Sequence, residues 1–199
     1  MNLQVLSRFN SFIKARLIEL FGVLLILLSL FIFISTITYS PSDPNFIYTP
    51  ESSEIQNIGG FYGSVIFDFL LQSIGFISFL VMITMSEWGI RLIIEKKIYH
   101  ISLKIFFILL YIIFGTTFIN IAFNNSFWLI DNGNSGFVGR IIKENIYTLS
   151  PIIENQYIVY VLILLTVIFF IFSMSLKIKE VYKILSFPFI IFYKLLLLF

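Results

Sequence analysis

The chain has 199 residues, of which 59% are hydrophobic and 12% charged, and its formal net charge is +2. A soluble domain is nearer half apolar and a quarter charged, so this chain has too little polar surface to cover a soluble globule. The mean hydropathy of +0.99 therefore indicates that lipid is its solvent. With no cysteine and a single histidine, His100, the sequence excludes disulfide frameworks, thiolate metal sites and histidine-based metal sites.

Four apolar runs divide the sequence, and each is long enough to cross a bilayer. The first, 20–37, would span roughly 27 Å as a helix, close to the thickness of the hydrocarbon layer. It lacks the cleavage site of a signal peptide, so we expect it to be retained. None of the runs alternates with period two, which favours helices over barrel strands. We predict an all-α integral membrane protein with transmembrane helices at about 20–39, 65–87, 104–123 and 157–176.

The lysine and arginine residues predict the orientation, because basic loops stay in the cytoplasm. Of the 13 basic residues, all but Arg140 and Lys143 lie before the first helix, between the second and third, or after the fourth. We therefore predict a cytoplasmic N-terminal segment at 1–16 and a four-helix membrane domain at 17–183. Both termini then lie in the cytoplasm (N-in/C-in), and the two longer loops are structured and face outward.

Two further segments have patterns of their own. Residues 131–136 are a cluster of turn-forming residues, and the spacing of apolar residues over 137–149 predicts a short amphipathic helix on the outer interface. Residues 184–199 are apolar but contain Pro188 and Lys194, and they are short for a span. We predict an interfacial helix or the start of a cytoplasmic linker there, in preference to a fifth span.

The second predicted helix carries a stripe of polar or small residues, spaced at helical intervals. Because an intramembrane carboxylate is a candidate functional group, the stripe is compatible with a channel or proton path that uses Asp68 and Gln72. No second carboxylate lies at membrane depth, so we favour a helix-packing stripe that faces protein. Its members are Ser64, Asp68, Gln72, Gly75 and Ser78.

The remaining polar residues predict no catalytic chemistry. No G-x-x-x-x-G-K-[ST], H-E-x-x-H or G-x-S-x-G pattern occurs, so we expect neither an enzyme active site nor a cofactor in this chain. Glu87 and Arg91 are expected to form an exposed pair, Trp88 to anchor at the interface and His100 to lie solvated in a loop. We expect the lysine clusters to set the topology and to attract anionic lipid.

Two motifs carry a resemblance to a known family. Residues 39–44 read Y-S-P-S-D-P directly after the first helix, and 57–75 fit N-x-x-G-x-x-G-x-x-x-x-D-x-x-x-x-x-x-G. Together they resemble the N-terminal four-helix membrane domain of the FtsK/SpoIIIE DNA translocases, over about 16–183. The start of the fourth helix, at Pro151, Glu154 and Asn155, departs from that family. The motif-loop residues are Tyr39, Ser40, Pro41, Asp43, Pro44, Asn57, Gly60 and Gly63.

The resemblance implies a membrane anchor and assembly domain of a DNA translocase. Such a domain is expected in the bacterial inner membrane at the division septum, acting in cell division and chromosome segregation. The expected partners are membrane lipid, further copies of the chain as a homo-oligomer, and septum proteins. DNA would be moved by an ATP-driven motor domain that is missing from this chain. The alternative is a small membrane transporter or channel subunit that uses the polar stripe.

Overall fold

The computed structural model describes residues 3–46, 54–125 and 132–196, and these residues form helices and loops without a β-strand. Four helical segments are long and apolar enough to cross a membrane: Ser7–Ile37, Gly60–Glu95, Ile101–Phe123 and Gln156–Ser173. The predicted all-α membrane fold is therefore confirmed. The segments extend beyond the predicted spans mainly at the beginning of the first and at both ends of the second.

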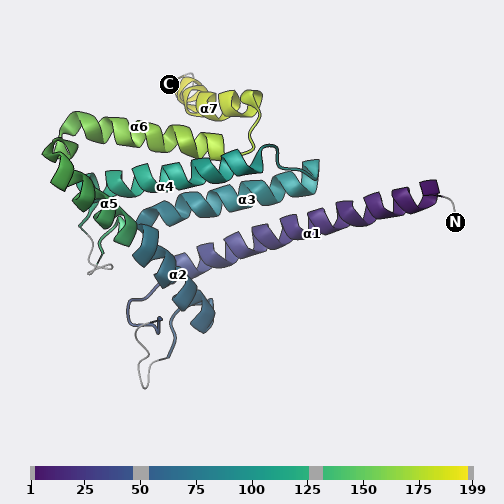
Figure 1. Cartoon of the computed structure of the whole chain (residues 1–199), viewed down its shortest axis with the longest axis horizontal. Helices are drawn as coiled ribbons and strands as arrows, with labels where there is room; N and C mark the ends of the chain where they lie inside the picture. Colours follow the sequence, from purple (N-terminus) through teal and green to yellow (C-terminus); the bar gives the residue numbers. More distant parts are fainter. Residues whose placement is uncertain (1–2, 47–53, 126–131, 197–199) are drawn as a thin grey trace.

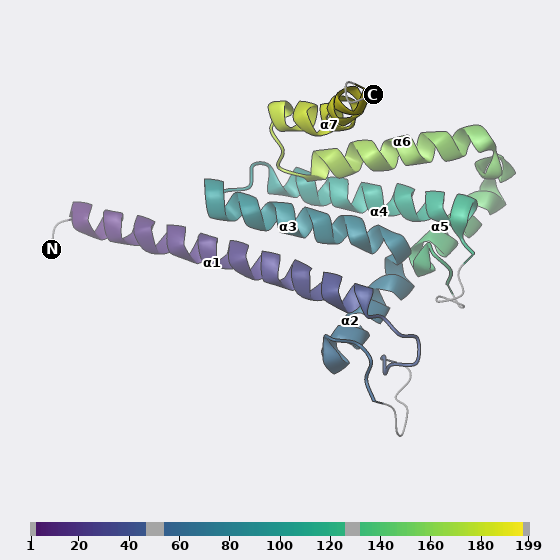
Figure 2. The same ribbon diagram turned by 180° about the vertical axis from the view of Figure 1, so that it is seen from behind.

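The bundle is built from two helix pairs (Figure 1). Helix α1 (Leu3–Ile37) packs on α3 (Ser78–Glu95), and α4 (Ile101–Phe123) packs on α6 (Gln156–Ser173). The fully buried Tyr111 of α4 joins the pairs, since its hydroxyl lies 3.4 Å from the Thr84 hydroxyl of α3. With 35 residues, α1 is roughly 52 Å long, and its N-terminal part projects beyond the other helices (Figure 2).

Helices α1 and α3 approach closely because small residues meet where they cross. A Cβ atom on Gly22 would lie 2.7 Å from the carbonyl oxygen of Gly89. Nearby, the Ser29 hydroxyl donates to the carbonyl of Met82 at 2.8 Å, and the Ser86 hydroxyl donates to Ser29 at 2.7 Å. Lipid provides no hydrophobic drive for helices to associate, so close backbone contact and interhelical hydrogen bonds stabilise this pair.

The second span is interrupted, whereas the sequence predicted a single helix at 65–87. Helix α2 (Gly60–Ile74) ends at a short 3₁₀ turn, η1 (Gly75–Ile77), before α3 begins. Gly75 has φ 55° and ψ −140°, a conformation that L side chains rarely adopt. The backbone N–H of Phe76 donates to the carbonyl of Asn134 at 3.0 Å. A loop from elsewhere in the chain therefore supplies the acceptor that an unbroken helix would have provided.

Helix α5 (Gly136–Leu149) and the loops around it cap the bundle at the end where α1 finishes. The amphipathic helix predicted at 137–149 is present as α5, followed by the 3₁₀ helix η2 (Pro151–Glu154). Asn155 then caps α6, because its side-chain oxygen accepts from the backbone N–H of Tyr157 at 2.9 Å. At the opposite end, α7 (Ile178–Leu196) stands apart from the bundle and begins before the predicted 184–199 segment (Figures 1 and 2).

Candidate functional site

Asp43 organises the loop that follows α1. Its side chain is only 3% exposed, and its two carboxylate oxygens accept from the backbone N–H groups of Gln56, at 2.9 Å, and Asn57, at 2.8 Å. Such charge-assisted hydrogen bonds are among the stronger ones in proteins. They hold the beginning and the end of this loop together, which accounts for the aspartate of the Y-S-P-S-D-P motif.

Asn57 and two glycines then fix the loop to the end of α1. The Asn57 side chain donates to the carbonyl of Ser35 and accepts from the backbone N–H of Gly59, both at 2.8 Å. A Cβ atom on Gly63 would lie 2.6 Å from the Ser35 hydroxyl oxygen, so only glycine lets α2 approach α1 this closely. Gly60, with φ +62°, forms the turn into α2.

Two further residues of the motif loop, Tyr39 and Pro44, contact the first two residues of the stripe. The Tyr39 hydroxyl donates to the Asp68 carboxylate at 2.9 Å, and the Ser64 hydroxyl donates to the carbonyl of Pro44, also at 2.9 Å. Burial, followed by the charge of Asp68, raises the pKa of Tyr39, so this hydroxyl stays protonated and remains a donor. Elsewhere in the loop, Ser40 and Ser42 share a hydrogen bond of 2.7 Å, and Pro41 is exposed.

Further along the stripe, two residues contact the loop between α4 and α5. The Gln72 side-chain oxygen accepts from the amide of Asn132 at 2.7 Å. A Cβ atom on Gly75 would overlap the carbonyl of Asn134 and lie 2.7 Å from the carbonyl carbon of Ser135. Ser78 lies beyond the helix break, fully buried, and its hydroxyl has no hydrogen-bond partner among the described residues.

These contacts show why position 75 requires glycine: the backbone of the loop between α4 and α5 leaves no room for a side chain. The sequence predicted that Gly75 belongs to a helix-packing stripe that faces protein. The structure places residues of the two loops against Ser64, Asp68, Gln72 and Gly75. The stripe also does not follow one continuous helix, because the positive φ of Gly75 separates Ser78 from the rest.

A second cluster lies at the opposite end of the bundle, around Arg91. The prediction of an exposed pair with Glu87 is wrong, because Arg91 is only 8% and Glu87 9% exposed. Arg91 donates to Glu87 at 2.8 Å, to Glu95 at 2.9 Å and also to Glu180 of α7. Helical spacing predicted the contact between Arg91 and Glu87, but it could not predict a contact with α7. The signal for the third contact was Glu180 itself, a lone acidic residue among the lysines that follow the fourth span.

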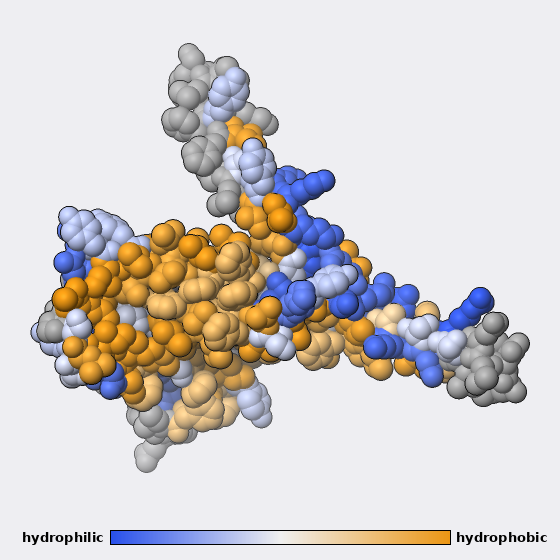
Figure 3. All heavy atoms as spheres, turned by 45° about the horizontal axis from the view of Figure 1, so that its top comes forward, coloured by the Kyte–Doolittle hydropathy of each residue, from blue (hydrophilic) through white to orange (hydrophobic). Residues whose placement is uncertain are grey.

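The segment between α6 and α7 is attached to α3 by several more contacts. The backbone N–H of Ser175 donates to Glu87 at 2.9 Å, and the Lys177 ammonium lies 2.8 Å from the Glu95 carboxylate. The indole N–H of Trp88, expected to be an interface anchor, donates to the carbonyl of Ser173 at 3.0 Å. Hydrophilic side chains gather over this end of the otherwise hydrophobic body (Figure 3). We call it the charged end, and the end with the motif loop the motif end.

Neither end has a candidate metal site within the described parts of the chain. No group of three or more histidine or acidic residues could hold a metal ion there. The carboxylates of Asp43, Glu87 and Glu95 accept from backbone amides or basic side chains of the protein itself. At both ends these contacts hold separate segments of the chain together.

The comparisons with known proteins agree with this architecture. The family model described as the 4TM region of DNA translocase FtsK/SpoIIIE matches residues 14–185. The DNA translocase FtsK of Azospirillum brasilense is 31% identical over 92 residues, which are 46% of this chain and 15% of that relative. The match thus covers a small part of a much longer protein. No solved structure matches. The chain belongs to the FtsK/SpoIIIE family of DNA translocases and carries its four-helix membrane region.

Proposed function

We propose that this chain is the membrane anchor and assembly domain of a DNA translocase at the bacterial division septum. The observation that carries the proposal is the attachment to α3 of α7, by the ion pair of Arg91 with Glu180, and of the segment before α7, by the ion pair of Lys177 with Glu95. A motor that pulls DNA also pulls on its anchor. The segment that leaves the last span is therefore expected to be held firmly, as it is here by two ion pairs.

We further propose that the charged end faces the cytoplasm and that both termini lie there. The first part of α1, the turn between α3 and α4, and α7 all lie toward this end (Figure 1). These segments, together with the adjoining ends of α3 and α4 and the residues just before α7, contain every basic residue except Arg140 and Lys143. The excess of basic residues at one end supports a cytoplasmic orientation. A reporter active only outside the cytoplasm should work after Glu51 or Asn134 and fail after Lys97 or Lys179. Activity after Lys97 would overturn the orientation.

The septal role is tested by where the chain goes in dividing cells. A fusion of the chain to a fluorescent protein should be enriched at the division septum of its host. The matched control is the same fluorescent protein on an unrelated four-helix membrane protein, which corrects for the double membrane at the septum. If both fusions are distributed alike, the septal part of the proposal fails.

Assembly is tested on the purified chain. We expect a homo-oligomer in mild detergent by native mass spectrometry, and contacts with septum proteins in cells. A strict monomer at all protein concentrations would contradict self-assembly.

DNA is proposed to be a partner only of a motor domain elsewhere in a full-length translocase. The pure chain should accordingly hydrolyse no ATP, and hydrolysis that survives purification and is lost on denaturation would refute this.

The alternative function, a channel or transporter subunit, is favoured by one observation. Discontinuous helices at membrane depth line many transport sites, and the second span is discontinuous at Gly75. Against it, Asp68 and Gln72 already bind Tyr39 and Asn132. Proton or cation flux into liposomes that contain the chain would support the alternative if Asp68→Asn abolished the flux and Asp43→Asn did not.

A further inference from the structure

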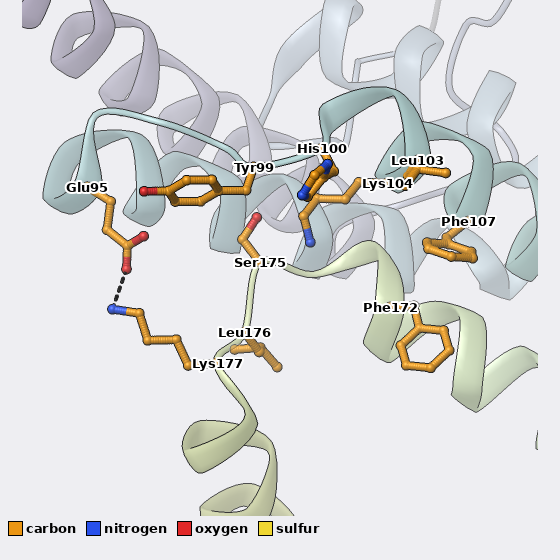
Figure 4. Close-up of a pocket in the computed structure, with 10 residues that line it drawn as sticks. All are labelled: Glu95, Tyr99, His100, Leu103, Lys104, Phe107, Phe172, Ser175, Leu176 and Lys177. Atoms are coloured by element: carbon orange, nitrogen blue, oxygen red, sulfur yellow. Dashed lines mark ion pairs between the residues drawn. The ribbon is translucent and has the colours of Figure 1, made fainter.

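A pocket of about 450 Å³ opens at the charged end, between the turn that precedes α4 and the segment that joins α6 to α7 (Figure 4). It lies beside the Arg91 cluster, and it shares Glu95, Ser175 and Lys177 with the contacts described at that end. Its lining divides into a polar part and an apolar part. The lining residues are Glu95, Tyr99, His100, Leu103, Lys104, Phe107, Phe172, Ser175, Leu176 and Lys177.

The polar part of the pocket can bind an anion. The Lys104 ammonium, the His100 imidazole and the Ser175 hydroxyl point toward the same space in Figure 4. The Ser175 hydroxyl oxygen is buried, and it has no hydrogen-bond partner among the described residues. Lys104 donates one bond to the carbonyl of Met174, which leaves two of its three ammonium protons for a ligand.

The one carboxylate in the lining does not cancel this positive character. Glu95 lies 2.9 Å from the Arg91 guanidinium, which it shares with Glu87 and Glu180, and 2.8 Å from the Lys177 ammonium, so it already has two cationic partners. Lys177 is 66% exposed and keeps two free ammonium protons at the rim. A phosphate group entering the pocket would therefore meet two ammonium groups: Lys104, whose hydrogen bond goes to a neutral backbone carbonyl, and Lys177, which shares Glu95 with Arg91.

The apolar part of the pocket lies toward the membrane. Phe107 of α4 and Phe172 of α6 are in contact, with ring centroids 5.4 Å apart. Leu103 and Phe172 are each 54% exposed, so this wall is open to the lipid rather than closed by protein. The pocket lies where α3 ends, α4 begins and α6 ends, which is the depth at which apolar spans give way to polar segments.

We propose that this pocket binds one anionic phospholipid, with the phosphate between Lys104, Lys177 and Ser175 and an acyl chain along Leu103, Phe107 and Phe172. A polar group that binds phosphate, placed directly above an apolar wall at the membrane boundary, matches the two halves of a phospholipid. The proposal rests on the membrane depth of the pocket and does not depend on the septal role of the chain.

The test compares two double variants that remove equal charge from the same end. Lys104→Gln with Lys177→Gln alters the pocket, whereas Lys97→Gln with Lys179→Gln removes two lysines outside it. Each purified chain is titrated with dioleoyl phosphatidylglycerol or dioleoyl phosphatidylcholine, and bound lipid is counted by native mass spectrometry. The unaltered chain should prefer phosphatidylglycerol. The pocket variant should bind it about thirtyfold more weakly, and the control variant should keep most of its affinity.

Two further measurements make the outcome decisive. Lys177→Gln alone leaves the Lys104 bond to Met174 in place, so it tests the site if the double variant fails to fold, with Lys179→Gln as its control. Its expected loss is roughly fivefold. Soluble glycerol phosphate is the second probe. Equal losses in pocket and control variants, or no loss in either, would overturn the proposal. Glycerol phosphate binding as tightly as the lipid would show a site for free phosphate instead.

Discussion

Arg91 and Glu87, one turn apart on α3, form an ion pair of 2.8 Å in which the two side chains are only 9% and 11% exposed. The same guanidinium also binds Glu95 and Glu180, so one arginine connects two turns of α3 to the first turn of α7. Buried charges are tolerated when they are paired, and removing Arg91 would leave the buried Glu87 carboxylate without a cationic partner.

Arg91→Met should therefore destabilise the chain strongly, by about 3 kcal/mol, because three carboxylates lose their common partner. The unfolding of the detergent-solubilised chain, followed by Trp fluorescence during denaturation with dodecyl sulfate, measures this loss. Arg16→Met is the matched control, since Arg16 pairs with Glu19 while its side chain is 61% exposed. Little change is expected there. Similar effects of the two substitutions would contradict the structural importance of the Arg91 cluster.

The helix break can be tested with two glycines that share a positive φ. Gly75→Ala combines backbone strain with a clash against the Asn134–Ser135 backbone, whereas a Cβ on Gly60 would meet nothing within 4 Å. Gly60→Ala should cost about 1 kcal/mol from strain alone. Gly75→Ala should cost clearly more, and its folded yield should be lower than that of Gly60→Ala. Equal losses would show that the close approach of the loop does not matter.

The Tyr39–Asp68 hydrogen bond can be isolated by a double-mutant cycle. Tyr39→Phe and Asp68→Leu should each destabilise the chain, and their coupling free energy should be on the order of 1 kcal/mol. Gly75→Leu should be more damaging than Asp68→Leu, because a clash with backbone relaxes less easily than a lost hydrogen bond. A coupling free energy of zero in the same unfolding assay would mean that the two side chains act independently.

The orientation of the stripe is a separate prediction, and the naturally cysteine-free chain is well suited to test it. Single cysteines introduced along 64–86 should be protected from a water-soluble reagent at the stripe positions. In crosslinking trials they should react with cysteines in the loops around Tyr39 and Asn132. Crosslinks concentrated instead at Phe69, Phe76 and Phe79 would show that the stripe faces lipid. Rapid labelling at positions 72 and 75 would revive the channel hypothesis.

Acid should release α7 from the bundle. The backbone N–H of Lys177 and the Arg91 side chain hold the pKa of Glu180 below its usual value of 4.5. A carboxyl group with a lowered pKa stabilises the folded form above its unfolded pKa, and that stabilisation disappears as the pH falls through the folded value. The attachment of α7 should therefore weaken below about pH 4.

Spin labels at two exposed positions can follow this release. Ile94 on α3 is 67% exposed and Tyr182 on α7 is 75% exposed, so both tolerate a label. The distance between them should increase and broaden at acidic pH. In the Glu180→Gln variant the wide distribution should be present already at neutral pH. A distance that stays constant from pH 7 to about pH 3 would contradict a role for Glu180 in holding α7.

The sequence by itself was sufficient to predict the membrane class, the four spans, the helix at 137–149 and the family. These properties depend on composition, on runs of apolar residues and on short motifs, all of which are local in the chain. Hydropathy places a span because each residue exchanges water for lipid largely independently of its neighbours. The Y-S-P-S-D-P motif is recognisable for a similar reason, since prolines and capping side chains act within a few residues.

Only the tertiary structure shows the contacts between segments that are distant in the chain. Helical spacing paired Glu87 with Arg91, but the burial of that pair depends on the approach of Glu180, 89 residues away from Arg91. The break at Gly75 likewise depends on Asn134, because the loop carbonyl replaces a helical acceptor. In lipid, helices gain nothing from apolar burial against one another, so small residues and a few polar bonds determine the packing. These few contacts produce only a weak periodic pattern in the sequence, so they could not be predicted from it.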